Sequence, residues 1–332
     1  MLEWADDLKV RDSELYLDSR QPRALCFVSH AHSDHLGRHG RAIATPATSA
    51  LASCRIGLRG TSEVPYHTDE MLPDGDTRVR LLPAGHVCGS AMIHVTRPEG
   101  TLLYTGDFKL RDCLTVPCAE PVEADHLVME STYGLPLFRF PPWRSVAEQL
   151  VELVELALRE GRQPIVMGYA LGKAQEATRI LTDAGVPVTL HGGVFALNQT
   201  CERLGVSLGP YRRYVAEDFH GPRALDLMQR GVLIAPPNVA RSPFVTRFKN
   251  PLRIMLSGWS MLKGAIYRYG VDHALPLSDH ADFDELMELI DRVRPKKIFT
   301  HHGYREFAGI LQGKGLDATA ARPDEQLMLF AD

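Results

Sequence analysis

A segment near the amino terminus, residues 30–35, holds four metal-binding side chains in six residues: His30, His32, Asp34 and His35. It directly follows the apolar run Leu25–Val28, which has the length and character of a buried strand. A solvated turn needs no such density of imidazole and carboxylate groups, and both groups are ligands of transition-metal ions. We therefore expect a fold in which the end of a buried strand presents a metal site.

Other apolar runs lead into residues that suit the same chemistry. The runs 79–82, 102–104 and 127–129 are followed within a few residues by His86, Asp107 and Glu130, and the run 297–300 leads into His301 and His302. These runs, together with 15–17, have the features of strands in a β-rich layer. Side chains at the ends of neighbouring strands can converge on one site.

The pattern changes near residue 141. Apolar residues recur at helical spacing through 145–161, and a strand-like run at 165–167, a helix-like stretch at 173–183 and a second run at 186–190 follow. This alternation predicts a small parallel α/β unit over 141–270. A helix at 283–293 and the His-rich strand end at 301–303 suggest that the first layer resumes, so that 1–140 and 271–332 form one discontinuous domain.

Composition limits the class of protein that this chain can be. The chain has 332 residues, of which 45% are hydrophobic and 23% charged, as in globular proteins. We find no apolar run near the length of about 18 residues that a membrane span needs, and no signal-peptide pattern at the start, so we expect a cytoplasmic protein. The six cysteines form no CxxC pair, and we expect most of them to be buried free thiols.

Charge is unevenly distributed. The net charge is −4, yet 201–270 contains 11 basic and 4 acidic residues, which leaves 26 basic and 37 acidic residues in the rest of the chain. The protein as a whole is therefore not a basic nucleic-acid coat. One region of it is suited to binding an anion.

The ligand types indicate which metal is bound. Two ions need about seven or eight protein ligands, and imidazole with carboxylate suits zinc, with manganese or iron as alternatives. In an HxHxDH loop the alternating histidines can face one ion and the Asp-His pair the other. A carboxylate such as Asp107 can bridge two ions about 3.5–4 Å apart.

These residues and their order resemble the metallo-β-lactamase superfamily. The resemblance implies that His30, His32 and His86 bind one ion, that Asp34, His35 and His302 bind the other, and that Asp107 bridges them. Either His301 or His302 could be the last ligand. The family pattern places the ligand immediately before glycine, which selects His302 and leaves His301 as a packing group.

Three further motifs, at 130–134, 169–176 and 278–282, resemble the β-CASP nucleases of that superfamily. The implied fold is an α/β class αββα sandwich with an inserted β-CASP α/β domain. The implied chemistry is attack on phosphorus by a hydroxide held between two divalent ions, with Asp34 among the catalytic residues. His280 would protonate the leaving oxygen while Glu130 orients it.

The same resemblance suggests residues that bind the substrate. Ser278 would hydrogen-bond a phosphate oxygen or cap the next helix, and Lys173 would bind phosphate at a helix start or be an ordinary exposed lysine. The basic region would grip a phosphate backbone, with these candidates: Arg212, Arg213, Arg241, Arg247 and Lys249. Its aromatic residues would either pack in a core, the more frequent role of such side chains, or stack on bases: Tyr211, Tyr214, Phe244 and Phe248.

The tracts 168–175 and 325–330 look most like the bacterial ligase-associated DNA exonucleases. This implies a DNA exonuclease in DNA repair, with a functional link to a DNA ligase. His302 departs from that pattern, since the position is typically His in RNA enzymes and often Val in DNA enzymes. An RNA-processing nuclease is the alternative. A small-molecule ester or thioester hydrolase would not need the insert, and a catalytically inactive binding protein would not need all seven ligands.

Overall fold

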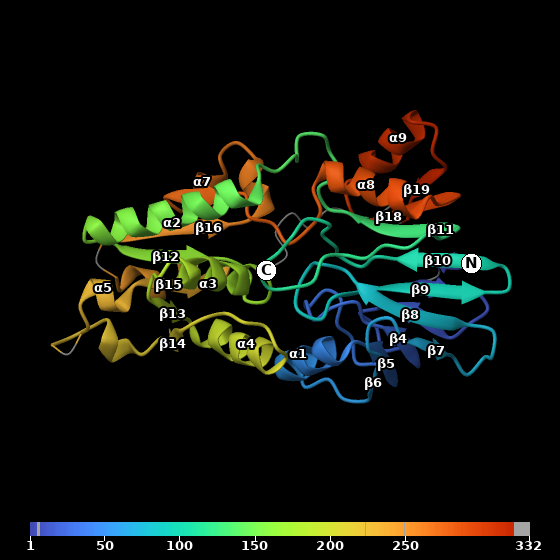
Figure 1. Ribbon diagram of the computed structural model, residues 1–332, viewed down its shortest axis with the longest axis horizontal. Coiled ribbons are helices and arrows are strands. Elements are labelled where there is room, and N and C mark those ends of the chain that lie inside the picture. The colour runs from blue at the N-terminus through green and yellow to red at the C-terminus, as the bar shows by residue number, and fades with distance from the viewer. Residues whose placement is uncertain (5–6, 223, 249, 322–332) are drawn as a thin grey trace. The chain divides into compact units, whose positions relative to one another are not determined.

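The structure is a computed structural model that describes residues 1–4, 7–222, 224–248 and 250–321 (Figure 1). Two sequence predictions, the 325–330 tract and the phosphate contact of Lys249, lie outside these residues. The chain divides into two compact units. The first comprises Met1–Arg139 and the described residues from His280 onward, and the second comprises Phe140–Asp279.

The first unit contains two sheets. The first sheet has six strands in the order β1 to β6: β1 Leu2–Trp4, β2 Leu8–Val10, β3 Leu15–Leu17, β4 Leu25–Phe27, β5 Arg41–Ala44 and β6 Thr61–Glu63. The second has seven strands in the order β19-β18-β11-β10-β9-β8-β7: β7 Asp69–Met71, β8 Arg78–Pro83, β9 Ala91–Arg97, β10 Gly100–Tyr104, β11 His126–Ser131, β18 Lys297–Gly303 and β19 Ala318–Ala320. Strands β10, β11, β18 and β19 run parallel.

An apolar core joins these sheets. Side chains such as Leu15 and Ile43 of the first sheet meet Leu81 of the second, and the rings of Phe27 and Tyr104 contact edge to face with centroids 6.2 Å apart. The other face of the second sheet is covered by α8 (Phe283–Val293) and α9 (Glu306–Gly313), while α1 (Pro46–Ile56) packs beside β6. The first unit is thus an αββα sandwich.

The second unit contains a six-stranded parallel sheet in the order β14-β13-β15-β12-β16-β17. Its strands are β12 Gln163–Met167, β13 Val188–Leu190, β14 Tyr211–Arg213, β15 Val232–Ala235, β16 Pro251–Leu256 and β17 His273–Leu275. Its longer helices are α2 Trp143–Arg159, α3 Lys173–Asp183 and α4 Gly192–Arg203. Shorter ones are α5 Leu227–Arg230, α6 Pro243–Thr246, α7 Ala265–Tyr269, η1 Ala216–Asp218, η2 Pro237–Arg241 and η3 Gly258–Met261.

Both faces of this parallel sheet are buried, as its connections require. Along β12, Val166 packs with α2 and α3, while Ile165 and Met167 face the opposite core. That second core contains Phe248, and the ring centroids of Tyr214 and Phe244 are 5.1 Å apart within the same aromatic cluster. The packing interpretation of these aromatic residues is therefore confirmed.

Several predicted elements agree closely with the structure. The predicted helices at 173–183 and 283–293 coincide with α3 and α8, and the helix expected at 145–161 is α2. The second unit extends to Asp279 rather than to Gly270, because β17 pairs with β16. The assignment of this unit as a β-CASP domain by residue range stays a prediction.

Two predictions concern general properties. All six cysteines are free, but only Cys26 and Cys201 are buried, so the expectation that most thiols would be buried is wrong. Cys54 on α1 and Cys118 in the 105–125 loop are exposed, because neither faces a core. Within the described ranges, every helix is too short or too polar to span a membrane.

Candidate metal centre

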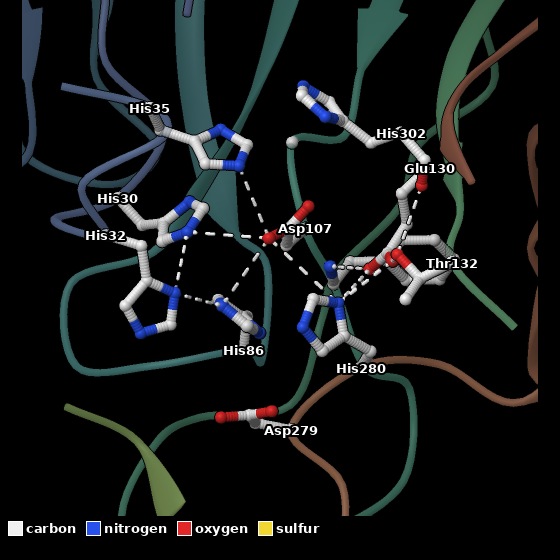
Figure 2. A network of polar contacts seen from close by, with 12 residues as sticks. His30, His32, His35, His86, Asp107, Glu130, Thr132, Asp279, His280 and His302 are labelled. Atoms are coloured by element: carbon white, nitrogen blue, oxygen red, sulfur yellow. Dashed lines mark hydrogen bonds and ion pairs between the residues drawn. The ribbon is translucent and has the colours of Figure 1, made fainter. Parts of the chain in front are cut away.

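The strand ends bring the sequence motifs together (Figure 2). The 30–35 segment follows β4, His86 follows β8, and Asp107 follows β10. Glu130 and His302 lie inside β11 and β18, which are neighbours in the second sheet. Figure 2 shows His30 and His32 on one side of Asp107, with Glu130 and Thr132 on the other.

Four side chains form a compact set of metal-ligand atoms, all within 4.8 Å of one another: His30, His32, His86 and Asp107. His32 Nδ1 lies 3.1 Å from His30 Nε2 and 3.0 Å from His86 Nε2. Asp107 Oδ2 lies 3.5 Å from His30 Nε2 and 3.7 Å from His86 Nε2. Ligands about 2.0–2.1 Å from a tetrahedral zinc ion are about 3.3 Å apart. The spacing and chemistry of this set therefore fit one zinc ion.

The ligands predicted for the second ion are less tightly gathered. His35 Nε2 lies 3.4 Å from the same Asp107 Oδ2 and 3.7 Å from Asp34 Oδ2, and the ring centroids of His35 and His302 are 5.0 Å apart. Among the described residues, however, Asp34, His35 and His302 do not together form a set within 4.8 Å. The donor types fit a divalent ion, and the division of ligands between two ions stays a prediction.

Asp18, which the sequence analysis missed, fixes the tautomers of two of these histidines. Ser29 Oγ donates to Asp18 Oδ2 at 2.5 Å, so its lone pair accepts the Nδ1–H of His30 at 2.9 Å. His35 Nδ1–H donates to the same Asp18 oxygen at 2.9 Å. Each ring therefore presents the lone pair of Nε2 to the centre, as metal-ligating histidines do. The only signal was that Asp18 directly follows the strand at 15–17, in a chain whose other site residues also follow strands.

Electrostatics favour a cation at this centre. Burial opposes ionisation of Asp107, but His35 and His280 hold the pKa of its carboxyl well below the usual range. Burial lowers the pKa of His30 well below its usual value, so that ring is neutral, the form that binds metal. Although burial opposes a charge on His35, Asp107 and Asp18 raise the pKa of that ring well above its usual range. The same carboxylates would stabilise a divalent ion beside it.

A bulge in β18 positions His302. The pairing of β11 with β18 passes from Glu130–His301 to Ser131–Gly303, so His302 is the extra residue. Its φ of +44° lies in the left-handed region, which is uncommon for a residue with a side chain. A Cβ on Gly303 would lie 1.9 Å from the carbonyl carbon of Ser131, so only glycine fits the next position. The bulge explains why the histidine before this glycine leaves the regular strand pattern.

His280 and Glu130 form a second part of the site. His280 Nδ1 lies 2.9 Å from Glu130 Oε2 and 3.9 Å from Asp107 Oδ2. Glu130 is buried, which raises its pKa, while His280 opposes that rise. Its Oε1 accepts the N–H of Phe108 at 2.8 Å, which fixes the carboxylate. When His280 donates Nδ1–H to Glu130, its Nε2 can exchange a proton with another group.

A clamp that the sequence analysis also missed holds the main chain of His280. Arg111 donates to the His280 carbonyl at 2.8 Å and forms an ion pair with Glu285. Glu285 in turn accepts the Arg111 N–H at 2.7 Å, and the Ala281 N–H donates to the Phe108 carbonyl at 2.7 Å. The chain that follows Asp107 thus grips the loop that carries His280.

The predicted substrate-binding residues lie in the second unit: Lys173, Arg212, Arg213, Arg241 and Ser278. Lys173 is buried at the start of α3 and ion-paired with Asp279, so the alternative of an exposed lysine is wrong: the Asp279 carboxylate compensates its charge. Ser278 is buried, and the N-cap of α8 is Asp282, which corrects the capping alternative for Ser278.

The three arginines differ in their surroundings. Arg212 donates from Nε to Thr189 Oγ1 at 3.0 Å, and Arg241 donates to the Arg268 carbonyl at 2.5 Å. Arg213 is exposed on the edge strand β14. Arg241 is exposed as well, whereas Arg212 is half-buried, so Arg213 and Arg241 are the two that are open to a ligand.

We expect Asp18→Asn to weaken zinc binding about 10- to 100-fold. An amide has a single acceptor oxygen, so it cannot replace both Oδ1, which accepts the Ser29 N–H, and Oδ2, which accepts from Ser29 Oγ and His35. Competition with a chromophoric chelator measures the affinity. Asp291→Asn, an exposed change on α8, is the matched control. Equal zinc affinity in both variants would show that Asp18 does not orient the ligands.

Comparisons with known proteins agree with this geometry. A family model described as "Zn-dependent metallo-hydrolase RNA specificity domain" matches residues 268–315. A "Probable DNA ligase" from Opitutus terrae is 38% identical over 318 residues, which cover 95% of this chain and 30% of that protein. "DNA cross-link repair protein SNM1" from Arabidopsis thaliana is 26% identical over 82% of this chain and 59% of its own length. The chain therefore spans less than two thirds of either relative.

A third relative is matched over most of its length. "Probable RNase MJ4" from Methanocaldococcus jannaschii is 24% identical over 91% of this chain and 88% of that protein. A solved structure of a protein of unknown function from Enterococcus faecalis covers 90% of this chain and 79% of its own, with a TM-score of 0.59 and 18% identity, and so shares the fold. The chain belongs to the metallo-β-lactamase superfamily, and within it to the β-CASP nuclease group.

Proposed function

We propose that this protein is a metal-dependent phosphodiesterase that cleaves nucleic acid, and that it acts as a DNA exonuclease in DNA repair. The observation that carries the proposal is the His280–Glu130 pair beside Asp107, with Nδ1 of His280 3.9 Å from the carboxylate of the metal-ligand set. A proton donor next to divalent ions is what cleavage of a phosphodiester with an alkoxide leaving group requires.

Each residue has a distinct part in this proposal. Two divalent ions, zinc by preference and manganese as the alternative, would activate a water molecule and stabilise negative charge on the phosphate. His30, His32, His86 and Asp107 would hold one, and Asp107 would share the other with Asp34, His35 and His302. His280 would deliver its Nε2 proton to the leaving oxygen. Glu130 would accept Nδ1–H throughout and so keep the ring in orientation.

The choice of polymer rests on the relatives. The relative with the higher identity is named a DNA ligase and another a DNA cross-link repair protein, which supports DNA and a functional link to ligation. The RNA alternative has specific support as well: the family model is described by RNA specificity, a relative of nearly the same extent is named an RNase, and His302 matches the RNA enzymes. Exonucleolytic action is part of the proposal. In it, the protein is cytoplasmic, and Arg213 in the basic region contacts the backbone.

End-labelled single- and double-stranded DNA and RNA of one sequence test the proposal. We expect the purified protein with zinc or manganese to shorten DNA from one end, and chelation of the metal to abolish cleavage because the ligand set then lacks its ions. Readdition of metal should restore activity. Degradation of RNA alone would replace DNA with the alternative, and hydrolysis of thioesters without any cleavage of nucleic acid would end the proposal.

We expect His280→Ala to slow cleavage of the oligonucleotide about 100- to 10,000-fold, the usual contribution of a general acid. The same variant should lose far less activity on bis(p-nitrophenyl) phosphate, whose leaving group needs no proton. Steady-state kinetics on both substrates measure the difference. An equal loss on both would assign His280 to metal binding or folding instead of proton transfer.

Arg111→Ala should lower kcat on the oligonucleotide about 10- to 100-fold with little change in KM, because His280 is displaced while the binding surface is unchanged. Arg139→Ala is a matched control, since Arg139 pairs with Asp284 on the first turn of α8 without contacting His280 through any described hydrogen bond. Zinc content and melting temperature report any structural damage. A normal kcat would show that the clamp does not position His280.

A further inference from the structure

A cavity of about 880 Å³ adjoins the metal centre within the first unit. Its walls include Arg20, Gln21 and Arg23 from the loop between β3 and β4, and its lining also includes Asp34 and His302. Its volume falls in the range of about 300–1,000 Å³ that is typical of small-ligand sites. Two of the predicted metal ligands, Asp34 and His302, thus share one cavity with this loop.

The loop is firmly held. Ser19 is buried, and its hydroxyl contacts Asp7 at 2.5 Å and accepts the Gln21 N–H at 3.1 Å. Arg23 donates from Nε to Asp7 at 3.0 Å and stacks over the Tyr16 ring, 4.5 Å from its centroid. A network of this kind fixes the backbone of a loop whose position on the surface would otherwise allow it to move.

The tip of the loop carries donors without partners. The side chains of Arg20 and Gln21 are exposed and make no hydrogen bond or ion pair with the residues that the structure describes. Of the acidic groups in the lining, Asp7 is paired with Arg23, and Asp18 accepts from Ser29, His35 and Tyr104. Asp34 belongs to the predicted metal ligands. The charge of Arg20 is therefore not compensated by the protein.

We propose that this cavity is a phosphate subsite, in which Arg20 and Gln21 bind the backbone phosphate next to the one that is cleaved. The inference rests on the proposed function, and it adds a position for the strand. A guanidinium and an amide can donate several hydrogen bonds to phosphate oxygens, and a fixed loop lowers the entropic cost of binding.

The geometry also assigns the side of the cleaved bond. The cavity lining in the described part of the chain includes His302 and Asp34 but not His280. Figure 2 shows the rings of His302 and His280 on opposite sides of Asp107. In the proposed function His280 protonates the leaving oxygen, so the leaving part of the strand lies on the His280 side. The subsite on the opposite side therefore holds the part of the strand that keeps the cleaved phosphate.

Arg20→Ala tests this subsite, with Gln21→Ala as a second variant. Arg78→Ala is the matched control, because Arg78 is also an exposed arginine, lies on β8 without a described hydrogen bond and is outside the cavity lining. The probes are a labelled single-stranded oligonucleotide, for binding by anisotropy without added metal and for cleavage with metal, and bis(p-nitrophenyl) phosphate, which has no neighbouring phosphate.

We expect Arg20→Ala to raise both the dissociation constant and KM of the oligonucleotide about tenfold, the effect of one charge-assisted hydrogen bond. The slope of log K against the logarithm of the salt concentration should decrease in magnitude by about 0.7, the value for one phosphate contact with a single strand. Hydrolysis of the small diester should be unchanged. Binding and KM equal to those of the Arg78→Ala control would overturn the subsite.

The two proposals fail in different ways. If the native protein cleaved neither substrate, the proposed function would fall, while weaker oligonucleotide binding by Arg20→Ala would still support an anion site at this loop. If native cleavage were normal and Arg20→Ala bound like the control, only the subsite would fall.

Discussion

Asp107 Oδ2 lies 3.4–3.9 Å from a ring nitrogen of each of four histidines: His30, His35, His86 and His280. These rings come from the ends of β4 and β8 and from the loop before α8, so the two sheets and a helix of the sandwich must be assembled before they can meet. A buried carboxylate and buried imidazoles are costly unless they are paired or bind a metal. A divalent ion among the converging lone pairs removes that cost, and this requirement organises the rest of the site.

Further contacts hold that arrangement on two sides. On the metal side, Asp18 and Ser29 fix which nitrogen of His30 and His35 faces the centre. On the other side, Glu130 fixes the His280 ring and Arg111 fixes its main chain. The N–H of Phe108, next to Asp107 in the chain, holds Glu130. The Asp107 carboxylate and the proposed proton donor are therefore positioned by one continuous segment.

The chain passes from the second unit to the first between Asp279 and His280, and each residue is anchored in its own unit. Asp279 pairs with the buried Lys173. Loss of one partner of a buried ion pair leaves an uncompensated charge, which destabilises a protein by about 3–5 kcal/mol. Lys173 thus has a structural role that its place at a helix start did not reveal.

The sequence predicted what local patterns encode. The HxHxDH loop follows an apolar run and the helix at 283–293 is a local pattern, so both were found from short-range features. The capping box of Asp282 and Glu285 that begins α8 was not among them. The residues that were missed act over long separations: Arg111 and Glu285 are 174 positions apart, and nothing near Arg111 indicates its partner. The bulge at His302 depends on pairing with β11, which periodicity within β18 cannot reveal. Asp18 lies 17 positions before His35 and belongs to no recognisable spacing.

Anomalous diffraction from crystals of the zinc-loaded protein tests the central claim most directly. The account predicts two zinc peaks about 3.5–4 Å apart. One should be bound by His30, His32 and His86 and the other by Asp34, His35 and His302, with Asp107 contacting both. A single peak, or a second peak away from Asp107, would contradict the bridged two-ion centre on which the proposed function depends.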